Sequence, residues 1–145
     1  MKKIIYLFVL LLALANGAHS ASGTPEVPVV AAFERTFTGA NHITWLQRIN
    51  IYQVNFAWEG SWVSAYYNSR SELICVTHQI LSSELPLPLQ RELKKRYSQF
   101  WISELFTLST DGEEYYYITL QSADKTLILE STDGAYWCCF GVYRK

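Results

Sequence analysis

The stretch FAWEGSWVSAYY, Phe56 to Tyr67, decides the fold, because it predicts two strands joined by a two-residue loop. Apolar and polar side chains alternate on both sides of Glu59-Gly60, which is the pattern of half-buried strands. Such a loop pairs Trp58 with Ser61 and thereby fixes the register behind it. The expected core face holds Val54, Phe56, Val63 and Ala65, and the opposite face Gln53, Asn55, Trp62, Ser64 and Tyr66.

Similar alternation extends in both directions from this hairpin. The aromatic share of 15% also favours strands. The predicted strands are His42–Ile49, Ile51–Trp58, Ser61–Tyr67, Leu73–Ile80, Trp101–Ser109, Glu114–Gln121, Lys125–Ser131 and Ala135–Tyr143. Two helices are predicted to begin near Pro28 and near Pro86, since proline suits the first helical turn. Leu89, Leu93 and Tyr97 form the inner face of the second helix.

The two halves of the chain match each other. At an offset of 60, Pro28 corresponds to Pro88, Phe33 to Leu93 and Phe37 to Tyr97; at an offset of 64, Tyr52 corresponds to Tyr116, Val54 to Ile118, Phe56 to Leu120, Ala65 to Leu129 and Cys75 to Cys139. We therefore predict an α+β domain over residues 28–145, made of two tandem helix-plus-antiparallel-strands repeats (about 28–82 and 83–145). The repeats form one sheet with helices packed on one face and the other face open.

Residues 1–20 have the pattern of a secretory signal peptide. Lys2-Lys3 precede the apolar run Ile4 to Ala15, and Ala18-His19-Ser20 offers small residues for cleavage after Ser20. The alternative, a membrane anchor, would need about 20 apolar residues. We expect a short linker over 21–27 and a periplasmic or secreted mature protein without a stable membrane span.

Charge and cysteine content narrow the class further. Removing Lys2 and Lys3 from the 12 basic residues leaves 10 against 13 acidic residues, a formal charge of −3, which argues against nucleic-acid binding. The three cysteines are Cys75, Cys138 and Cys139. An odd count leaves at least one thiol unpaired within the chain. Two alternatives stay open: Cys75 bridges one of the other two, or the cysteines act as small buried hydrophobic residues.

These features resemble the secreted PepSY-like family, also described as beta-lactamase-inhibitor-like. The resemblance covers about residue 29 to the C-terminus and rests on the segments FERTF, ANHITW, YQVNF, LPLPLQRELKKRY, YYYITL and STDG, together with the signal peptide. It implies an α+β fold of two tandem repeats, export, and no known catalysis. It further implies binding or inhibition of a periplasmic or extracellular hydrolase. No inhibitory contact residue is carried over, because no contact motif of the inhibitor is recognisable.

Residues able to carry catalysis or bind a metal or cofactor are few. His42 and His78 lack metal-ligand spacing, and Cys75 and His78 are expected to face opposite ways on one strand. Glu113-Glu114 adjoin a turn, where solvated charge is ordinary. The segment RELKKR is expected to be a solvated helix face, or else a dock for an acidic protein patch or anionic lipid. We predict no catalytic residues, no metal and no cofactor.

The aromatic residues left on the open face are the best candidates for function. By register these are Trp62, Tyr66, Tyr115 and Tyr117. Tyr and Trp are enriched in binding hot spots, although cross-strand aromatic pairs also stabilise exposed sheet faces. The leading hypothesis is an exported, non-enzymatic module that binds a protein partner through this face, and a hydrolase inhibitor is one version of it. The alternatives are a carrier of a glycan or apolar ligand and, least supported, an enzyme.

Overall fold

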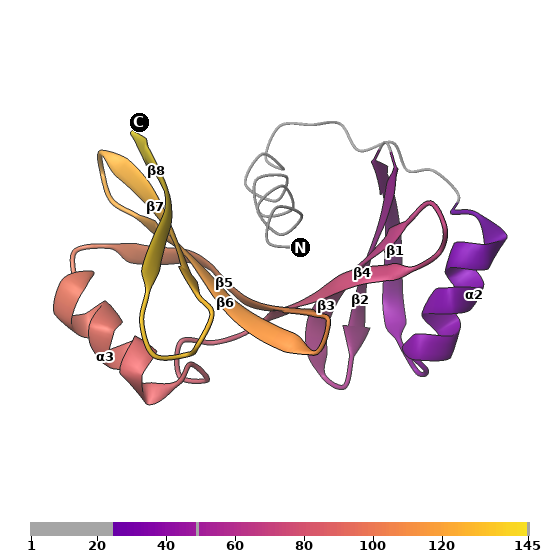
Figure 1. Ribbon diagram of the computed structural model, residues 1–145, viewed down its shortest axis with the longest axis horizontal. Helices are drawn as coiled ribbons and strands as arrows, with labels where there is room; N and C mark the ends of the chain where they lie inside the picture. Colours follow the sequence, from indigo (N-terminus) through magenta and orange to yellow (C-terminus); the bar gives the residue numbers. More distant parts are fainter. Residues whose placement is uncertain (1–24, 49, 145) are drawn as a thin grey trace.

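The computed structural model describes residues 25–48 and 50–144, and its elements follow the predicted order. A helix and four strands are followed by a second helix and four more strands (Figure 1). The bounds are α2 Val27–Thr36, β1 Asn41–Arg48, β2 Ile51–Trp58, β3 Ser61–Asn68, β4 Leu73–Gln79, α3 Leu87–Arg96, β5 Trp101–Thr110, β6 Glu113–Gln121, β7 Lys125–Ser131 and β8 Cys138–Arg144. The first seven strands begin and end within one residue of their predicted bounds. The predicted signal peptide and most of the linker lie outside the described residues.

All eight strands form one antiparallel sheet in which sequence neighbours are spatial neighbours, from β1 to β8. Both helices lie on the same face of this sheet, α2 over the first half and α3 over the second (Figure 1). The fold class, α+β with an open antiparallel sheet, is thus confirmed. That the two halves arose by duplication stays a prediction.

The β2–β3 hairpin has the predicted register. Glu59 and Gly60 both have positive φ, 50° and 83°, as the turn of a two-residue hairpin requires. Trp58 pairs with Ser61, and the pairs behind it follow one for one to Ile51 and Asn68. Val54, Phe56, Val63 and Ala65 are consequently buried under α2, as expected from their alternation.

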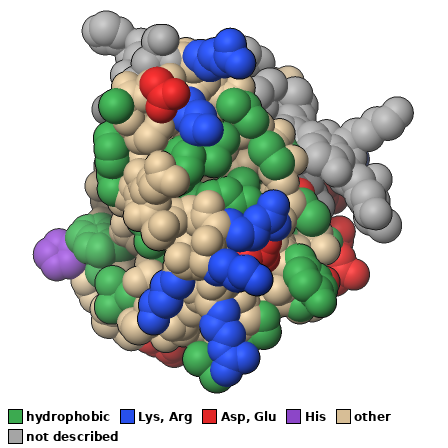
Figure 2. Space-filling view, turned by 90° about the vertical axis from the view of Figure 1, so that its left-hand side faces the viewer, with side chains coloured by type: hydrophobic (Ala, Val, Ile, Leu, Met, Phe, Trp, Pro, Cys, Tyr) green, Lys and Arg blue, Asp and Glu red, His purple; other side chains and the backbone are tan. Residues whose placement is uncertain are grey.

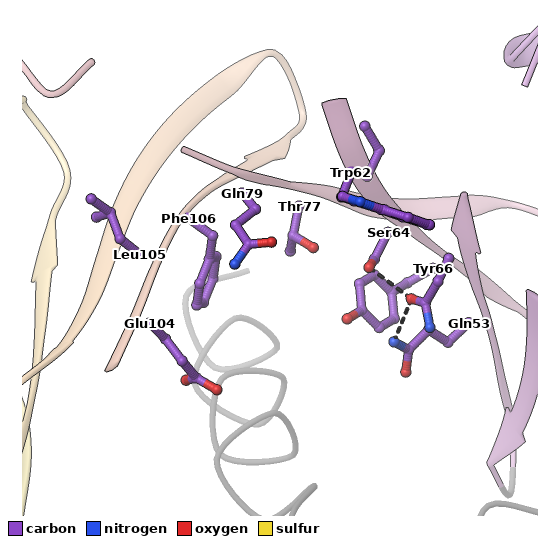
Figure 3. A pocket seen from close by; sticks show the side chains of 11 residues that line it. Gln53, Trp62, Ser64, Tyr66, Thr77, Gln79, Glu104, Leu105 and Phe106 are labelled. Carbon is purple, nitrogen blue, oxygen red and sulfur yellow. Dashed lines mark hydrogen bonds between the residues drawn. The ribbon is translucent and has the colours of Figure 1, made fainter. Parts of the chain in front are cut away.

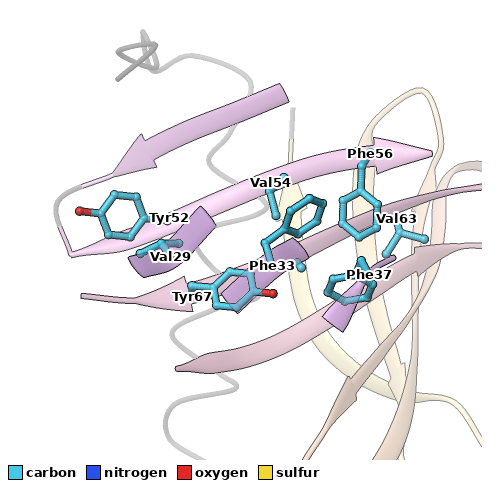
Figure 4. Close-up of a cluster of buried hydrophobic side chains, with 9 residues drawn as sticks. Val29, Phe33, Phe37, Tyr52, Val54, Phe56, Val63 and Tyr67 are labelled. Atoms are coloured by element: carbon cyan, nitrogen blue, oxygen red, sulfur yellow. The ribbon is translucent and has the colours of Figure 1, made fainter. Parts of the chain in front are cut away.

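The first half of the sheet is held to α2 by aromatic rings (Figure 4). Phe33 lies at the centre, with its ring centroid 4.9 Å from that of Phe56 and 5.4 Å from that of Trp45. Phe37, one turn further on, lies 4.8 Å from Phe56 and 5.4 Å from Trp58. Edge-to-face packing of this kind adds to the free energy gained by burying the rings.

The second half has a mainly aliphatic core, built from Leu85, Leu89, Leu105, Ile118, Leu120, Leu129 and Trp137. Trp137 explains why β8 begins three residues later than predicted. Its indole donates a hydrogen bond to the Leu89 carbonyl of α3 at 3.2 Å, and its backbone N–H donates to Glu92 at 3.0 Å. The preceding turn is closed by the Asp133 carboxylate, which accepts from the backbone of Ala135 and Tyr136. Residues 135–137 therefore serve the turn and the helix contact instead of the sheet.

Neither helix within the described part of the chain is long and apolar enough to cross a membrane.

Phe33→Ala is expected to lower the free energy of unfolding by about 3–5 kcal/mol, because it opens a cavity among packed rings. Glu34→Ala, at the exposed neighbouring position of the same helix, should change it by less than about 0.5 kcal/mol. Urea denaturation of both variants measures the difference. A loss below about 1 kcal/mol for Phe33→Ala would show that the ring cluster does not hold α2 to the sheet.

Candidate functional site

The open face consists of the strand side chains that point away from α2 and α3. Register places all four candidate residues on it. Tyr66 pairs with Cys75 of β4. Tyr115 pairs with Leu108 of β5, which pairs with Thr77 of β4, and Tyr117 pairs with Phe106, which pairs with Gln79. Trp62 lies two residues before Ser64, the partner of Thr77. Their accessibility differs sharply. Trp62 is 56% exposed and Tyr115 half-buried, whereas Tyr66 and Tyr117 are 4% and 1% exposed.

A hollow of about 400 Å³ opens on this face over β3, β4 and β5 (Figure 3). Trp62 and Tyr66 lie at one side of it and Phe106 at the other, and Thr77 and Gln79 project between them (Figure 3). The remaining lining side chains are Gln53, Asn55, Val63, Ser64, Glu104 and Leu105. The hollow thus combines aromatic walls with amides, hydroxyls and one carboxylate.

Hydrogen bonds hold the polar side of the hollow in place. The Asn55 Oδ1 atom accepts from Gln53 Nε2 at 2.9 Å and from Ser64 Oγ at 2.7 Å. The Glu104 carboxylate accepts from the Thr119 hydroxyl at 3.2 Å. These contacts fix side chains within β2 and across the strand pairs β2–β3 and β5–β6, so the polar groups are prearranged for binding.

Tyr115 and Tyr117 belong to a second group of rings and carboxylates on the same face. Phe106 stacks on Tyr117 with centroids 5.5 Å apart, and Phe140 meets the same ring edge-on at 6.1 Å. The Tyr117 hydroxyl donates to Glu130 at 2.5 Å, and the Tyr115 hydroxyl donates to Glu113. The hydrogen bond to Glu113, followed by burial and by the charges of Glu113, Glu130 and Asp111, raises the pKa of Tyr115 to about 12.

Sequence reasoning did not single out Glu104, Phe106 or Glu130 as members of this face. The signal was present in the two-residue alternation of β5 and β7. It would have placed Glu104 and Phe106 on the open face, because pairing behind the Asp111-Gly112 turn runs unbroken from Thr110 to Glu104. The bulge of β5 begins only beyond Glu104, towards Ile102.

All three cysteines are free thiols, so neither of the bridges considered for Cys75 is present. Cys75 is buried on the open-face side with Tyr66, Leu108 and Tyr117, while Cys138 and Cys139 are exposed on edge strand β8. Burial raises the pKa of the Cys75 thiol to about 12. Cys75 therefore stays protonated at neutral pH and is a poor nucleophile.

The other candidates for chemistry are dispersed. His78 pairs with Val63 and Thr107 on the helix side, opposite to Cys75 as predicted. Glu113 and Glu114 accept hydrogen bonds from Tyr115 and Tyr116 on opposite faces and so form no acid pair. Across the described residues, no group of His, Cys, Asp or Glu is arranged to hold a metal ion. The RELKKR segment lies on α3, where Arg96 bonds Glu92 at 2.6 Å.

The fold is a two-layer α+β domain with one eight-stranded sheet. Two helices cover one face of this sheet, and the open face carries aromatic and polar side chains.

No family model and no curated protein matches the sequence. Solved structures do match its fold. A "DUF2874 family protein" from Bacteroides ovatus has a TM-score of 0.73 at 16% identity over 84% of this chain and 89% of that one.

Two further Bacteroides structures agree. A "BLIP-like protein" from Bacteroides fragilis has a TM-score of 0.71 at 14% identity, covering 86% of this chain and 88% of that one. A structure described as "putative periplasmic proteins" from Bacteroides eggerthii has a TM-score of 0.72 at 13% identity, covering 84% and 90%. The chain thus shares the fold of BLIP-like proteins, and the resemblance found in the sequence is confirmed at the level of the fold.

In the reduced, folded protein at pH 8, two of the three thiols should react promptly with a small disulfide reagent such as 5,5′-dithiobis(2-nitrobenzoic acid). The slow thiol is Cys75, because its raised pKa and its burial both remove the reactive thiolate. Cys75→Ala should keep the prompt phase and lose the slow one, and urea should bring the third thiol of the unaltered protein into the prompt phase. Three equally fast thiols in the folded protein would contradict the burial of Cys75.

Proposed function

We propose that the protein is an exported, non-enzymatic binding module that uses its open face against a protein partner in the periplasm or outside the cell. The observation that carries the proposal is the hollow on that face, with the exposed Trp62 at its side. A large exposed aromatic beside prearranged polar groups has the composition of a binding hot spot. Export rests on the signal-peptide pattern of residues 1–20, with cleavage after Ser20.

One version of this function is inhibition of a hydrolase. It is supported by the shared fold with the BLIP-like protein from Bacteroides fragilis, at the level of fold only. A non-enzymatic role is further supported by the inert Cys75 and by the separation of the histidines and acids that sequence analysis considered. A duplicated ancestor would account for the repeated order of one helix and four strands.

Trp62→Ala combined with Tyr115→Ala should reduce capture of the partner from an envelope extract by at least about tenfold, because hot-spot aromatics contribute roughly 2 kcal/mol or more each. The buried Tyr66 and Tyr117 are left in place, since their removal would destabilise the fold. Tyr136→Ala, an exposed aromatic in the β7–β8 turn, is the matched control.

The readout is quantitative mass spectrometry of proteins retained by each immobilised variant, with unfolding midpoints measured alongside. A partner retained equally by the double variant would contradict the assignment of the open face. So would equal loss with the Tyr136 control.

A small-ligand carrier is the second candidate, and one observation favours it. A groove of about 420 Å³ runs between α3 and the sheet, and its lining combines Leu93, Tyr97, Phe100, Ile102 and Leu120 with the polar side chains of Ser82, Ser83, Gln90, Lys94 and Ser98. A carrier would keep a bound small molecule through native mass spectrometry of the exported protein. The binding-module proposal predicts the mass of the polypeptide alone.

A further inference from the structure

Three acidic side chains lie on the open face of the sheet. Register places Glu104, Glu113 and Glu130 on the open face, through their pairs Thr119, Thr110 and Tyr117. The described Lys and Arg side chains all lie elsewhere, namely Arg35, Arg70, Arg91, Lys94, Lys95, Arg96, Lys125 and Arg144. Arg48, whose side chain is not described, pairs with Ile51, an open-face position two residues before Gln53.

Helix α3 and its surroundings hold most of the described Lys and Arg side chains. Figure 2 shows Lys and Arg side chains gathered on the end of the molecule that carries α3, and this helix contributes Arg91, Lys94, Lys95 and Arg96. Lys125 lies nearby on the helix side, with its Nζ atom 5.3 Å from the centre of the Phe100 ring. The open face therefore carries acidic side chains and none of the described Lys or Arg side chains, whereas the basic residues of α3 lie on the helix side together with acids such as Glu92 and Glu114.

The hollow repeats this bias on a smaller scale. Glu104 is the single charged side chain among the described residues that line it. Thr77 projects into it and is only 8% exposed. An amide oxygen, a hydroxyl and a carboxylate all accept hydrogen bonds. A guest with N–H donors and a positive charge can use every one of them, whereas an anionic guest would meet Glu104 without a compensating cation.

The walls of the hollow favour the same guest. Trp62 and Phe106 line the hollow from its two sides, and aromatic rings attract cations, arginine most often. A planar guanidinium can stack on an aromatic ring while the N–H groups at its edge donate hydrogen bonds to a carboxylate. A lysine ammonium is not planar and cannot combine the two contacts in this way. At about 400 Å³, against roughly 30 Å³ for each water of liquid, the hollow has room for one such side chain with water around it.

From this arrangement we infer that the partner presents a basic surface to the open face and inserts an arginine or lysine side chain into the hollow between Trp62, Phe106 and Glu104. The inference rests on the proposed function and gives its protein partner a chemistry. The acidic group around Tyr115, with Glu113 and Glu130, extends the complementary surface beyond the hollow. Opposite potentials on the two surfaces also speed the encounter and reject acidic proteins.

The test uses three matched octapeptides as probes: alternating arginine and glycine, the same peptide with citrulline for arginine, and the same with glutamate. Each is titrated into the ¹⁵N-labelled exported protein, and the indole N–H signal of Trp62 is followed, assigned by its loss in Trp62→Phe. The arginine peptide should shift this signal saturably, and the uncharged citrulline peptide should bind at least about tenfold more weakly. The glutamate peptide should not bind.

Two charge variants identify the acceptor. Glu104→Gln should raise the Kd of the arginine peptide about tenfold, because it removes the negative charge but keeps an oxygen that can accept a hydrogen bond from Thr119. Glu114→Gln, which alters an exposed acid of β6 on the other face, should change this Kd by less than about twofold. Glu104→Lys should abolish binding of the arginine peptide and admit the glutamate peptide. Equal unfolding midpoints show that each variant is folded.

Equal binding of the arginine and citrulline peptides, or no effect of Glu104→Gln, would overturn the inference, as would a preference for glutamate. These failures differ from failure of the proposed function. If partner capture depends on Trp62 and Tyr115 while the arginine peptide does not bind at all, the open face is supported as the contact surface but the inferred preference for a basic partner is wrong. If capture does not depend on Trp62 and Tyr115, both the proposed contact surface and the inferred preference for a basic partner are wrong.

Discussion

The register of the β2–β3 hairpin is the constraint on which the rest of the structure depends. Glu59 and Gly60 can adopt the two positive φ angles of a two-residue turn, and this turn sets Trp58 opposite Ser61. A slip of one residue would turn Phe56 and Val63 away from α2 and bring polar groups into its ring cluster. Because the strands pair in sequence order, the same choice of faces passes from this hairpin to the neighbouring strands.

The two faces then have different tasks. The helix face holds two cores, aromatic under α2 and mainly aliphatic under α3, and these account for most of the buried side chains. The open face buries a smaller cluster around Tyr66 and Tyr117 and leaves Trp62 accessible beside the hollow. The open face also carries Glu104, Glu113 and Glu130 without any described Lys or Arg side chain, which suits a partner with a basic surface.

Much of this could be predicted from the sequence, because strand alternation and turn residues act locally. The bounds of seven strands and the faces of Phe56, Val63 and Trp62 follow from those signals alone. The start of β8 could not be predicted, since the bonds of Trp137 to Leu89 and Glu92 join residues more than 40 positions apart. The hollow was also beyond the sequence, because it forms only where side chains of β2, β3, β4 and β5 meet, and Gln53 and Phe106 are more than 50 positions apart.

Site-specific photocrosslinking in the producing cell tests most directly whether the open face is the contact surface. A photoreactive benzoylphenylalanine replaces Trp62 in one strain and Lys94, exposed on α3, in another. Our account predicts a discrete protein adduct from position 62 and none from position 94. An adduct from position 94 alone would contradict it and would make the basic helix the contact surface.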